Sequence, residues 1–179
     1  MPEQVKRIAL IGYRGSGKTT IAQILADRLG FKVFELDRLI DERAGEKIPE
    51  IVAKFGWEKF RRLETELLAE IVKRENAVLD LGGGVVEKEE NRKLVKDHCF
   101  VVWLQARPEV LMDRIKDSTC RPSLTGKSIV DEVSEVLARR EPLYQSLSQL
   151  TLDTEKISPE QATEEIIRQL GLSEKSKRK

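Results

Sequence analysis

The feature of this sequence that most limits its possible folds is the segment at residues 12–19, Gly-Tyr-Arg-Gly-Ser-Gly-Lys-Thr, which fits the pattern G-x-x-x-x-G-K-[ST]. An apolar run at residues 8–11 precedes it, and an amphipathic helical pattern at about residues 18–29 follows. At the average frequency of glycine, such a segment arises by chance in only about one chain in a hundred. The segment therefore predicts a strand, a loop that binds nucleotide phosphates, and a helix.

The residue types in this loop suit the binding of ATP. Glycine leaves room for backbone N–H groups to surround phosphate oxygens, and the following helix directs its N-terminal dipole at the same anion. We expect Lys18 to reach the β- and γ-phosphates and the Thr19 hydroxyl to ligate Mg²⁺. A glycine-rich turn that contains lysine by coincidence is the alternative. The residues predicted to bind the nucleotide here are Gly15, Ser16, Gly17, Lys18, Thr19 and Thr20.

Apolar runs and helical patterns alternate along the rest of the chain. Further strands are predicted at residues 31–36, 77–81, 100–104 and 150–153. Helices are predicted at residues 37–43, 48–55, 57–74 and 159–170, with another starting at Pro108 and a long one reaching about Glu141, where Pro142 should break or kink it. This alternation implies an α/β fold with a mostly parallel sheet, whose ligands bind beyond the C-terminal strand ends.

Length and composition limit the classes of protein that remain. The 179 residues suffice for a single domain, predicted at 1–172, with a charged and disordered tail at 173–179. The 32 basic residues nearly balance the 31 acidic ones, which disfavours a nucleic-acid partner. We see no signal peptide, no apolar run long enough for a membrane span, and no metal or disulfide pattern in the two cysteines. We therefore expect a cytoplasmic protein with no membrane partner.

Polar residues that follow the predicted strands can serve a phosphate acceptor. Asp37 follows the second strand, where its carboxylate can accept a hydrogen bond from an attacking hydroxyl or simply cap a helix. Arg61 and Glu64 share a helix face, where they can bind a carboxylate and a hydroxyl or form a surface ion pair. The glycines at 82–84 end the third strand and allow either a close ligand or a tight turn.

A late polar segment, about residues 118–128, is predicted to form a mobile lid. Arg121 in this segment can neutralise charge on a transferred phosphoryl group when the lid closes. Arg140 lies where the long helix is expected to break and can recognise an anion. Solvated surface charge is the alternative for both arginines. The lack of an N-K-x-D sequence disfavours a GTPase, and the short chain favours a metabolite kinase.

Taken in order, the segments GYRGSGKT, Asp37, FRRLE, LGGG, RPSL and RREPLY resemble the shikimate kinase family from about residue 8 to residue 167. The resemblance implies that the γ-phosphate of ATP is transferred to the 3-hydroxyl of shikimate, giving shikimate 3-phosphate in aromatic amino-acid biosynthesis. It also implies a P-loop three-layer sandwich with a five-stranded parallel sheet of order 2-3-1-4-5, Mg²⁺ as the metal, and a monomer.

The resemblance implies roles for individual residues. Asp37 would act as the base or orient the acceptor hydroxyl, and Arg61 and Arg140 would bind the shikimate carboxylate. Arg114 would pack on the adenine, and Arg121 would contact ATP from the lid. The residues implied to bind shikimate are Asp37, Arg61, Glu64, Gly83, Gly84 and Arg140, and those implied to act in catalysis are Lys18, Asp37 and Arg121.

Three features depart from the family pattern, and rival functions remain open. The lid reads Arg-Pro-Ser-Leu where the family often has Arg-Pro-Leu-Leu, so the packing of the lid can differ. Glu35 stands where the family commonly has aspartate, so the geometry around the metal can differ. Asp80 lies within the third strand, either near the metal or as a satisfied buried carboxylate. The rivals are a kinase of another metabolite such as gluconate, a nucleoside monophosphate kinase, and a non-catalytic binding or regulatory module.

Overall fold

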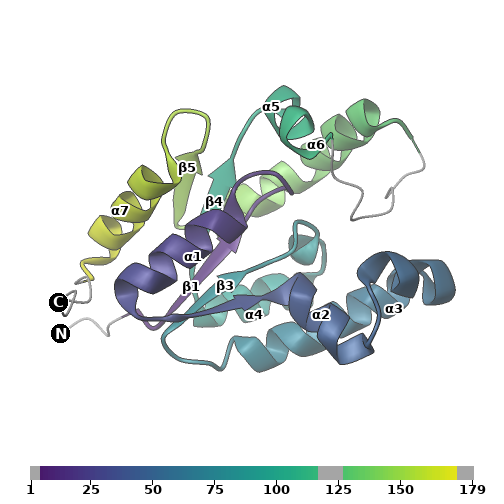
Figure 1. Cartoon of the computed structure of the whole chain (residues 1–179), viewed down its shortest axis with the longest axis horizontal. Coiled ribbons are helices and arrows are strands. Elements are labelled where there is room, and N and C mark those ends of the chain that lie inside the picture. The colour runs from purple at the N-terminus through teal and green to yellow at the C-terminus, as the bar shows by residue number, and fades with distance from the viewer. Residues whose placement is uncertain (1–4, 117–126, 173–179) are drawn as a thin grey trace.

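In the computed structural model, which describes residues 5–116 and 127–172, strands and helices alternate along the chain (Figure 1). The strands are β1 (Arg7–Ile11), β2 (Lys32–Glu35), β3 (Ala77–Asp80), β4 (Phe100–Gln105) and β5 (Leu150–Asp153). The helices are α1 (Lys18–Leu29), α2 (Leu36–Ala44), α3 (Ile48–Ile71), the short 3-10 helix η1 (Val85–Glu87), α4 (Glu89–His98), α5 (Pro108–Ile115), α6 (Ile129–Leu147) and α7 (Pro159–Leu170).

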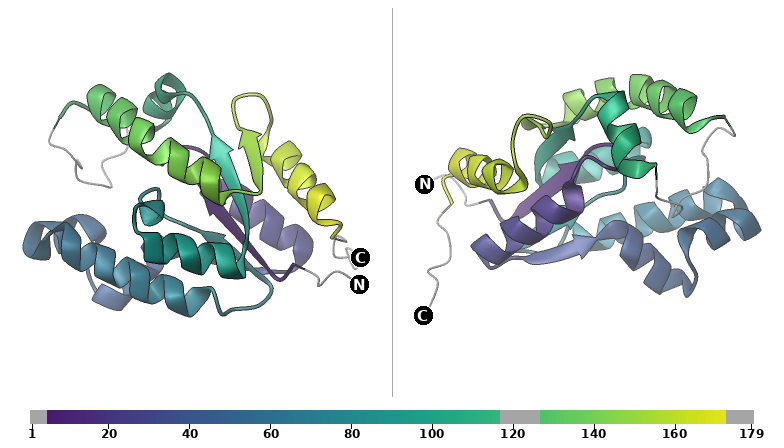
Figure 2. Two further views of the ribbon diagram at one scale, coloured as in Figure 1. Left: turned by 180° about the vertical axis from the view of Figure 1, so that it is seen from behind. Right: turned by 45° about the horizontal axis from the view of Figure 1, so that its top comes forward.

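The strands form one parallel sheet in the order β2-β3-β1-β4-β5. Successive residues of the central strand β1 point to opposite faces, and all of them from Ile8 to Ile11 are buried. Ile8 and Leu10 pack with α1 and α7, whereas Ala9 and Ile11 pack with the core on the α2, α3 and α6 side. The predicted α/β class and strand order are therefore confirmed, with helices covering both faces (Figure 2).

Local sequence signals place several element boundaries as predicted. Gly56 has non-helical angles (φ 79°, ψ 173°) and interrupts α3, which separates two helical stretches. Ser158 and Gln161 form the reciprocal hydrogen bonds of a capping box at the start of α7. Pro108 occupies the first turn of α5, where its missing N–H costs no hydrogen bond.

The long helix α6 does not end near Glu141 as the sequence predicts; it continues through Pro142 to Leu147. A proline inside a helix removes one hydrogen bond and crowds the preceding turn. Packing beyond the proline offsets that cost, because Tyr144 and Leu147 are buried in the core. In addition, the Tyr144 hydroxyl donates a 2.6 Å hydrogen bond to the Gly83 carbonyl. This final turn of α6 is therefore fixed by tertiary contacts that sequence periodicity does not reveal.

Helix α4 is also absent from the sequence prediction. Its residues are mostly charged, and only Asn91 and Val95 of the helix are buried, so its apolar periodicity is weak. Most of the predicted lid, including Arg121, and the tail at 173–179 lie outside the described residues. Within the described part of the chain, no helix has the combination of length and apolar character that crossing a membrane requires.

Candidate functional site

The loop between β1 and α1 has the shape that the sequence motif predicts. Gly15 and Gly17 have positive φ angles of 85° and 94°, which residues with side chains rarely adopt. Gly12 packs so closely on β4 that a Cβ atom there would lie 2.5 Å from the Leu104 carbonyl oxygen. The buried Lys18 curls back into the loop, where its Nζ donates to the carbonyl oxygens of Gly12 (2.8 Å) and Tyr13 (3.1 Å). The loop therefore surrounds a fixed positive charge.

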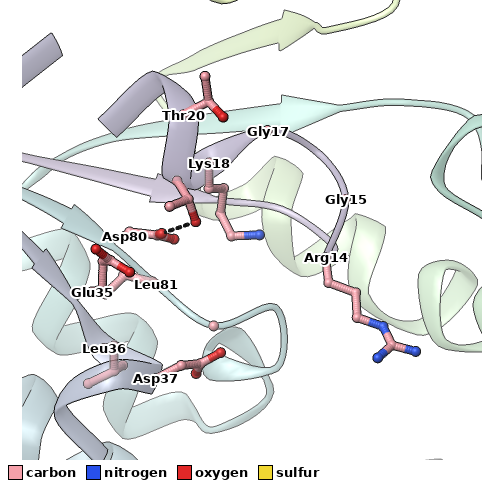
Figure 3. A pocket seen from close by; sticks show the side chains of 12 residues that line it. Arg14, Gly15, Gly17, Lys18, Thr20, Glu35, Leu36, Asp37, Asp80 and Leu81 are labelled. Carbon is pink, nitrogen blue, oxygen red and sulfur yellow. Dashed lines mark hydrogen bonds between the residues drawn. The ribbon is translucent and has the colours of Figure 1, made fainter. Parts of the chain in front are cut away.

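A cavity of about 620 Å³ opens beside this loop at the C-terminal edge of the sheet. Figure 3 shows Lys18 and Arg14 on the loop side, with Glu35 and Asp37 on the opposite side. The predicted residues Gly15, Gly17, Lys18, Thr19, Thr20 and Asp37 all line the cavity. The structure thus brings the phosphate loop and the predicted acceptor carboxylate to one cavity.

Asp37 lies half-buried in the first turn of α2. The N-cap of that helix is Glu35, so the interpretation of Asp37 as a helix cap is wrong. Its place on the cavity wall opposite the phosphate loop is the one that an acceptor-orienting carboxylate needs (Figure 3).

Asp80, whose role the sequence leaves open, is bound to the phosphate loop. The Thr19 hydroxyl donates a 2.6 Å hydrogen bond to its Oδ2 atom (Figure 3). Glu35 pairs with Asp80 across β2 and β3 and also lines the cavity. Burial raises the pKa of Asp80, while the charge of Lys18 and the Thr19 hydrogen bond oppose that shift. Asp80 is therefore both satisfied and placed at the phosphate site.

The oxygen atoms of Thr19, Glu35 and Asp80 are a donor set that fits a hard cation such as Mg²⁺. In residues 5–116 and 127–172, no three or more His, Cys, Asp and Glu side chains are grouped so that they could hold a metal ion.

Arg61 and Glu64 form an ion pair inside the protein. Arg61 Nη1 lies 2.8 Å from Glu64 Oε1, and the side-chain exposures are 14% and 0%. The Arg61 guanidinium also stacks near the rings of Phe60 (4.9 Å) and Trp57 (5.8 Å). The alternative of a surface ion pair is therefore wrong for these two residues.

The glycines after β3 make room for two guanidinium groups. A Cβ atom on Gly84 would lie only 2.2 Å from Arg61 Nη2, and one on Gly83 would lie 3.2 Å from Arg140 Nη1. Arg140 is 3% exposed and lies near the Tyr13 ring of the phosphate loop, so it is not a solvated surface charge. The segment forms a turn, in which the Val85 N–H donates to the Gly82 carbonyl (3.1 Å), and side chains added at positions 83 and 84 would also press on the two arginines.

Glu87 contacts both of these arginines, and no motif in the sequence marks it as a site residue. Its Oε1 accepts hydrogen bonds from Arg140 Nε (3.1 Å) and from Arg139 Nη2 (2.6 Å). Its Oε2 lies 3.8 Å from Arg61 Nη2. Burial opposes ionisation of Glu87, but the nearby arginine charges outweigh burial and hold its pKa below the ordinary value.

Arg114 lies on the other side of the phosphate loop. Its Nη1 donates to the Gly15 carbonyl (3.0 Å) and to Thr154 Oγ1 (3.1 Å). These residues line a second cavity of about 150 Å³ next to the loop, together with Ser16, Gly17, Thr20, Ile21, Ile157 and Pro159. The predicted adenine contact therefore faces a cavity that adjoins the phosphate site.

Comparison with known proteins agrees with this geometry. The family model described as "Shikimate kinase" matches residues 14–171. The chain is 36% identical over 165 residues to a shikimate kinase of Thermodesulfovibrio yellowstonii, covering 92% of this chain and 95% of the relative. It is 40% identical over 169 residues to shikimate kinase 2 of an Enterobacter species, covering 93% and 96%. The solved shikimate kinase of Acinetobacter baumannii in complex with shikimate has a TM-score of 0.89 and 31% identity, with 93% of each chain covered.

Proposed function

The chain belongs to the shikimate kinase family, and we propose that it transfers the γ-phosphate of ATP to the 3-hydroxyl of shikimate in the cavity beside the phosphate loop. The observation that carries this proposal is the pair of buried guanidiniums, Arg61 and Arg140, held against Gly83 and Gly84. Arg140 lies near Tyr13 of the phosphate loop, and Arg61 lies against the neighbouring Gly84. Two guanidiniums fixed in this way suit an acceptor that carries a carboxylate. Gluconate also carries a carboxylate, and family membership decides for shikimate.

On the acceptor side, Arg61 and Arg140 bind the carboxylate and so fix the ring of the substrate. Glu64, which is buried against Arg61, holds that guanidinium in place and supports the substrate site. Asp37 then accepts a hydrogen bond from the attacking hydroxyl across the cavity from the phosphate loop. Most of the acceleration comes from this positioning, because phosphoryl transfer requires little covalent chemistry from the protein.

On the nucleotide side, the loop amides and Lys18 bind the phosphates of ATP. Lys18 would exchange its hydrogen bonds to the Gly12 and Tyr13 carbonyls for phosphate oxygens. Arg114 lines the neighbouring cavity and packs on the adenine. We keep Arg121 as the lid arginine on the grounds of the sequence alone.

We assign Thr19 as the residue that would ligate Mg²⁺ directly. Glu35 and Asp80 would lie around the ion without being assigned as direct ligands. When bound, Mg²⁺ would supply positive charge that neutralises the charge developing on the phosphate oxygens. The Asp80 carboxylate accepts a hydrogen bond from the Thr19 hydroxyl, which leaves the lone pairs of the Thr19 oxygen available for a cation. Glutamate at position 35 brings its carboxylate to the cavity with a longer reach than aspartate.

Coupled-assay ADP release with Mg·ATP tests the proposal, with shikimate, gluconate and nucleoside monophosphates each added as the acceptor. We expect strong stimulation by shikimate alone. Turnover with another acceptor only would leave a P-loop kinase and contradict shikimate as the substrate. ATP binding without turnover on any acceptor would favour a regulatory module.

We also propose that residues 1–172 act as one kinase domain and that the enzyme is a cytoplasmic monomer. Both proposals follow from the pattern of the sequence and its family. Light scattering on the purified full chain tests the monomer, and a mass of twice 20.4 kDa would contradict it.

A further inference from the structure

We propose that Glu87 is a positioning residue that sets the arrangement of Arg61 and Arg140 for binding the acceptor carboxylate. This inference rests on the proposed function, since it concerns how that site recognises its substrate. Glu87 ends η1, shortly after the glycines that follow β3. Figure 2, left, shows the loop between β3 and α4 lying between α3 and α6, the helices that carry the two arginines.

The carboxylate of Glu87 reaches both guanidiniums from this place. Oε1 accepts the 3.1 Å hydrogen bond from Arg140 Nε, and Oε2 lies 3.8 Å from Arg61 Nη2. A guanidinium is a rigid planar fork, so binding at the Nε edge of Arg140 also fixes the direction of its Nη atoms. One of these atoms, Nη1, lies next to Gly83. Glu87 therefore determines which edge of Arg140 is presented to a ligand.

A third arginine holds Glu87 itself in position. Arg139 donates to Glu87 Oε1 from Nε at 3.0 Å and from Nη2 at 2.6 Å. Arg139 is 54% exposed, whereas Arg140 is 3% exposed, so these neighbours approach the same carboxylate from the solvent and from the interior. The Glu87 carboxylate is therefore restrained on both sides and is not a freely rotating surface group.

The charge of Glu87 also allows the two buried arginines to stay together. Guanidiniums repel one another, and their burial strengthens that repulsion because little water screens it. Glu64 compensates Arg61 directly, and Glu87 contacts Arg140. With both glutamates in place, the cluster of three arginines keeps an excess of positive charge, which an acceptor carboxylate would neutralise.

The test compares Glu87→Gln, which keeps the shape and removes the charge, with the wild-type enzyme in steady-state kinetics. We expect the KM for shikimate to rise about tenfold, in line with the loss of a charged hydrogen-bond partner. The KM for ATP and kcat should stay the same, because the Glu87 side chain contacts Arg61, Arg139 and Arg140 rather than the phosphate loop. The methyl ester of shikimate lacks the carboxylate charge and can be tested as a competitive inhibitor. The ratio of its inhibition constant to the KM for shikimate should be smaller in the variant than in the wild type.

Glu87→Asp provides a second variant that keeps the charge and shortens the reach, and we expect an intermediate rise in the KM for shikimate. Glu70→Gln is the matched control, since Glu70 forms a bidentate ion pair with Arg43 on the surface. That control should leave both KM values unchanged. If Glu87→Gln does not fold, Glu87→Asp decides the question.

An unchanged KM for shikimate in the folded variants would overturn the role of Glu87. So would a rise in the KM for ATP as large as the rise in the KM for shikimate. The wild-type enzyme separates this failure from failure of the proposed function. Wild-type turnover of shikimate with no KM change in either variant contradicts only the role of Glu87, whereas no wild-type turnover contradicts both.

Discussion

The Thr19 hydroxyl donates a 2.6 Å hydrogen bond to Asp80, which links the start of α1 to the end of β3. A hydroxyl has one proton and two lone pairs, so this bond fixes the rotation of Thr19 and leaves its lone pairs available. Asp80 is buried and pairs with Glu35 in the sheet. Two carboxylates and one oriented hydroxyl therefore lie at the place that we propose for a nucleotide-bound cation.

Asp80→Asn should weaken the binding of Mg²⁺ together with nucleotide, because it removes charge next to Thr19. We expect the affinity for ADP to fall about tenfold in the presence of Mg²⁺ and to remain unchanged without it. Calorimetry with ADP in the two conditions provides the measurement. Asp41→Asn is the control, since Asp41 caps the Ile48 backbone away from the cavity. Equal ADP affinity of wild type and Asp80→Asn in Mg²⁺ would contradict this role.

Lys18→Ala should abolish most turnover while sparing acceptor binding. The lysine is fixed inside the phosphate loop, and under the proposed function its positive charge would stabilise the transferred phosphoryl group. We expect kcat to fall on the order of a hundredfold or more. Shikimate affinity, measured by calorimetry without nucleotide, should match the wild type. A variant that lost shikimate binding and kept its rate would refute the assignment.

Arg61→Ala should act on the other substrate. It removes one of the two carboxylate-binding groups and leaves buried Glu64 without this partner. The KM for shikimate should rise on the order of a hundredfold, while the KM for ATP changes little. Arg62→Ala is a matched control on the same helix, because Arg62 is 61% exposed and forms a long ion pair with Glu58. If Arg61→Ala kept its shikimate affinity, the carboxylate assignment would be wrong.

Gly84→Ala should damage the acceptor site by steric displacement alone. Gly84 has φ −91°, which alanine adopts without strain, but the added Cβ would lie 2.2 Å from Arg61 Nη2. We expect the KM for shikimate to rise about tenfold or more as Arg61 is forced aside. Gly45→Ala is the converse control: φ is 70°, and the space around it is open, so stability should fall without a change in KM. Thermal unfolding and kinetics distinguish the two.

Cys99 should be inert in the folded enzyme, because burial raises its pKa from 9.0 to about 12. In a Cys120→Ser background, alkylation at pH 8 should be about a thousandfold slower in the native state than in urea. The stability that this thiol contributes is complete below pH 9 and is lost as the pH rises toward about 12, because the unfolded chain ionises first. Equal alkylation rates for native and unfolded protein would contradict the burial of Cys99.

Local sequence signals were enough to predict the strands and the phosphate loop, whereas the order of the strands in the sheet came from the family resemblance. The loop motif, the buried strands around it and the capping residues of α7 each depend on contacts between near neighbours. Helix α4 and the last turn of α6 depend instead on distant partners, such as the bond from Tyr144 to Gly83. The periodicity of the sequence does not reveal such contacts. Helix α4 was therefore not predicted, and the end of α6 was predicted too early.

The same distinction applies to the site. Lys18, Thr19 and Asp37 were predictable because a motif or a strand end marks them, and they line one cavity. Glu87 was missed because its function depends on α3 and α6 meeting beside η1, and its own neighbours in sequence carry no motif. Asp80 was recognised only as an unusual acid in a strand, and its bond to Thr19 decides where it points.

The most direct test of the central claim is identification of the product formed from ATP and shikimate by the purified enzyme. Mass spectrometry followed by proton and phosphorus NMR would show whether one phosphate has been added and at which hydroxyl. We predict a single product, shikimate 3-phosphate, formed in equal amount to ADP. Release of ADP without phosphorylated shikimate, or phosphate at another hydroxyl, would contradict the account of this site.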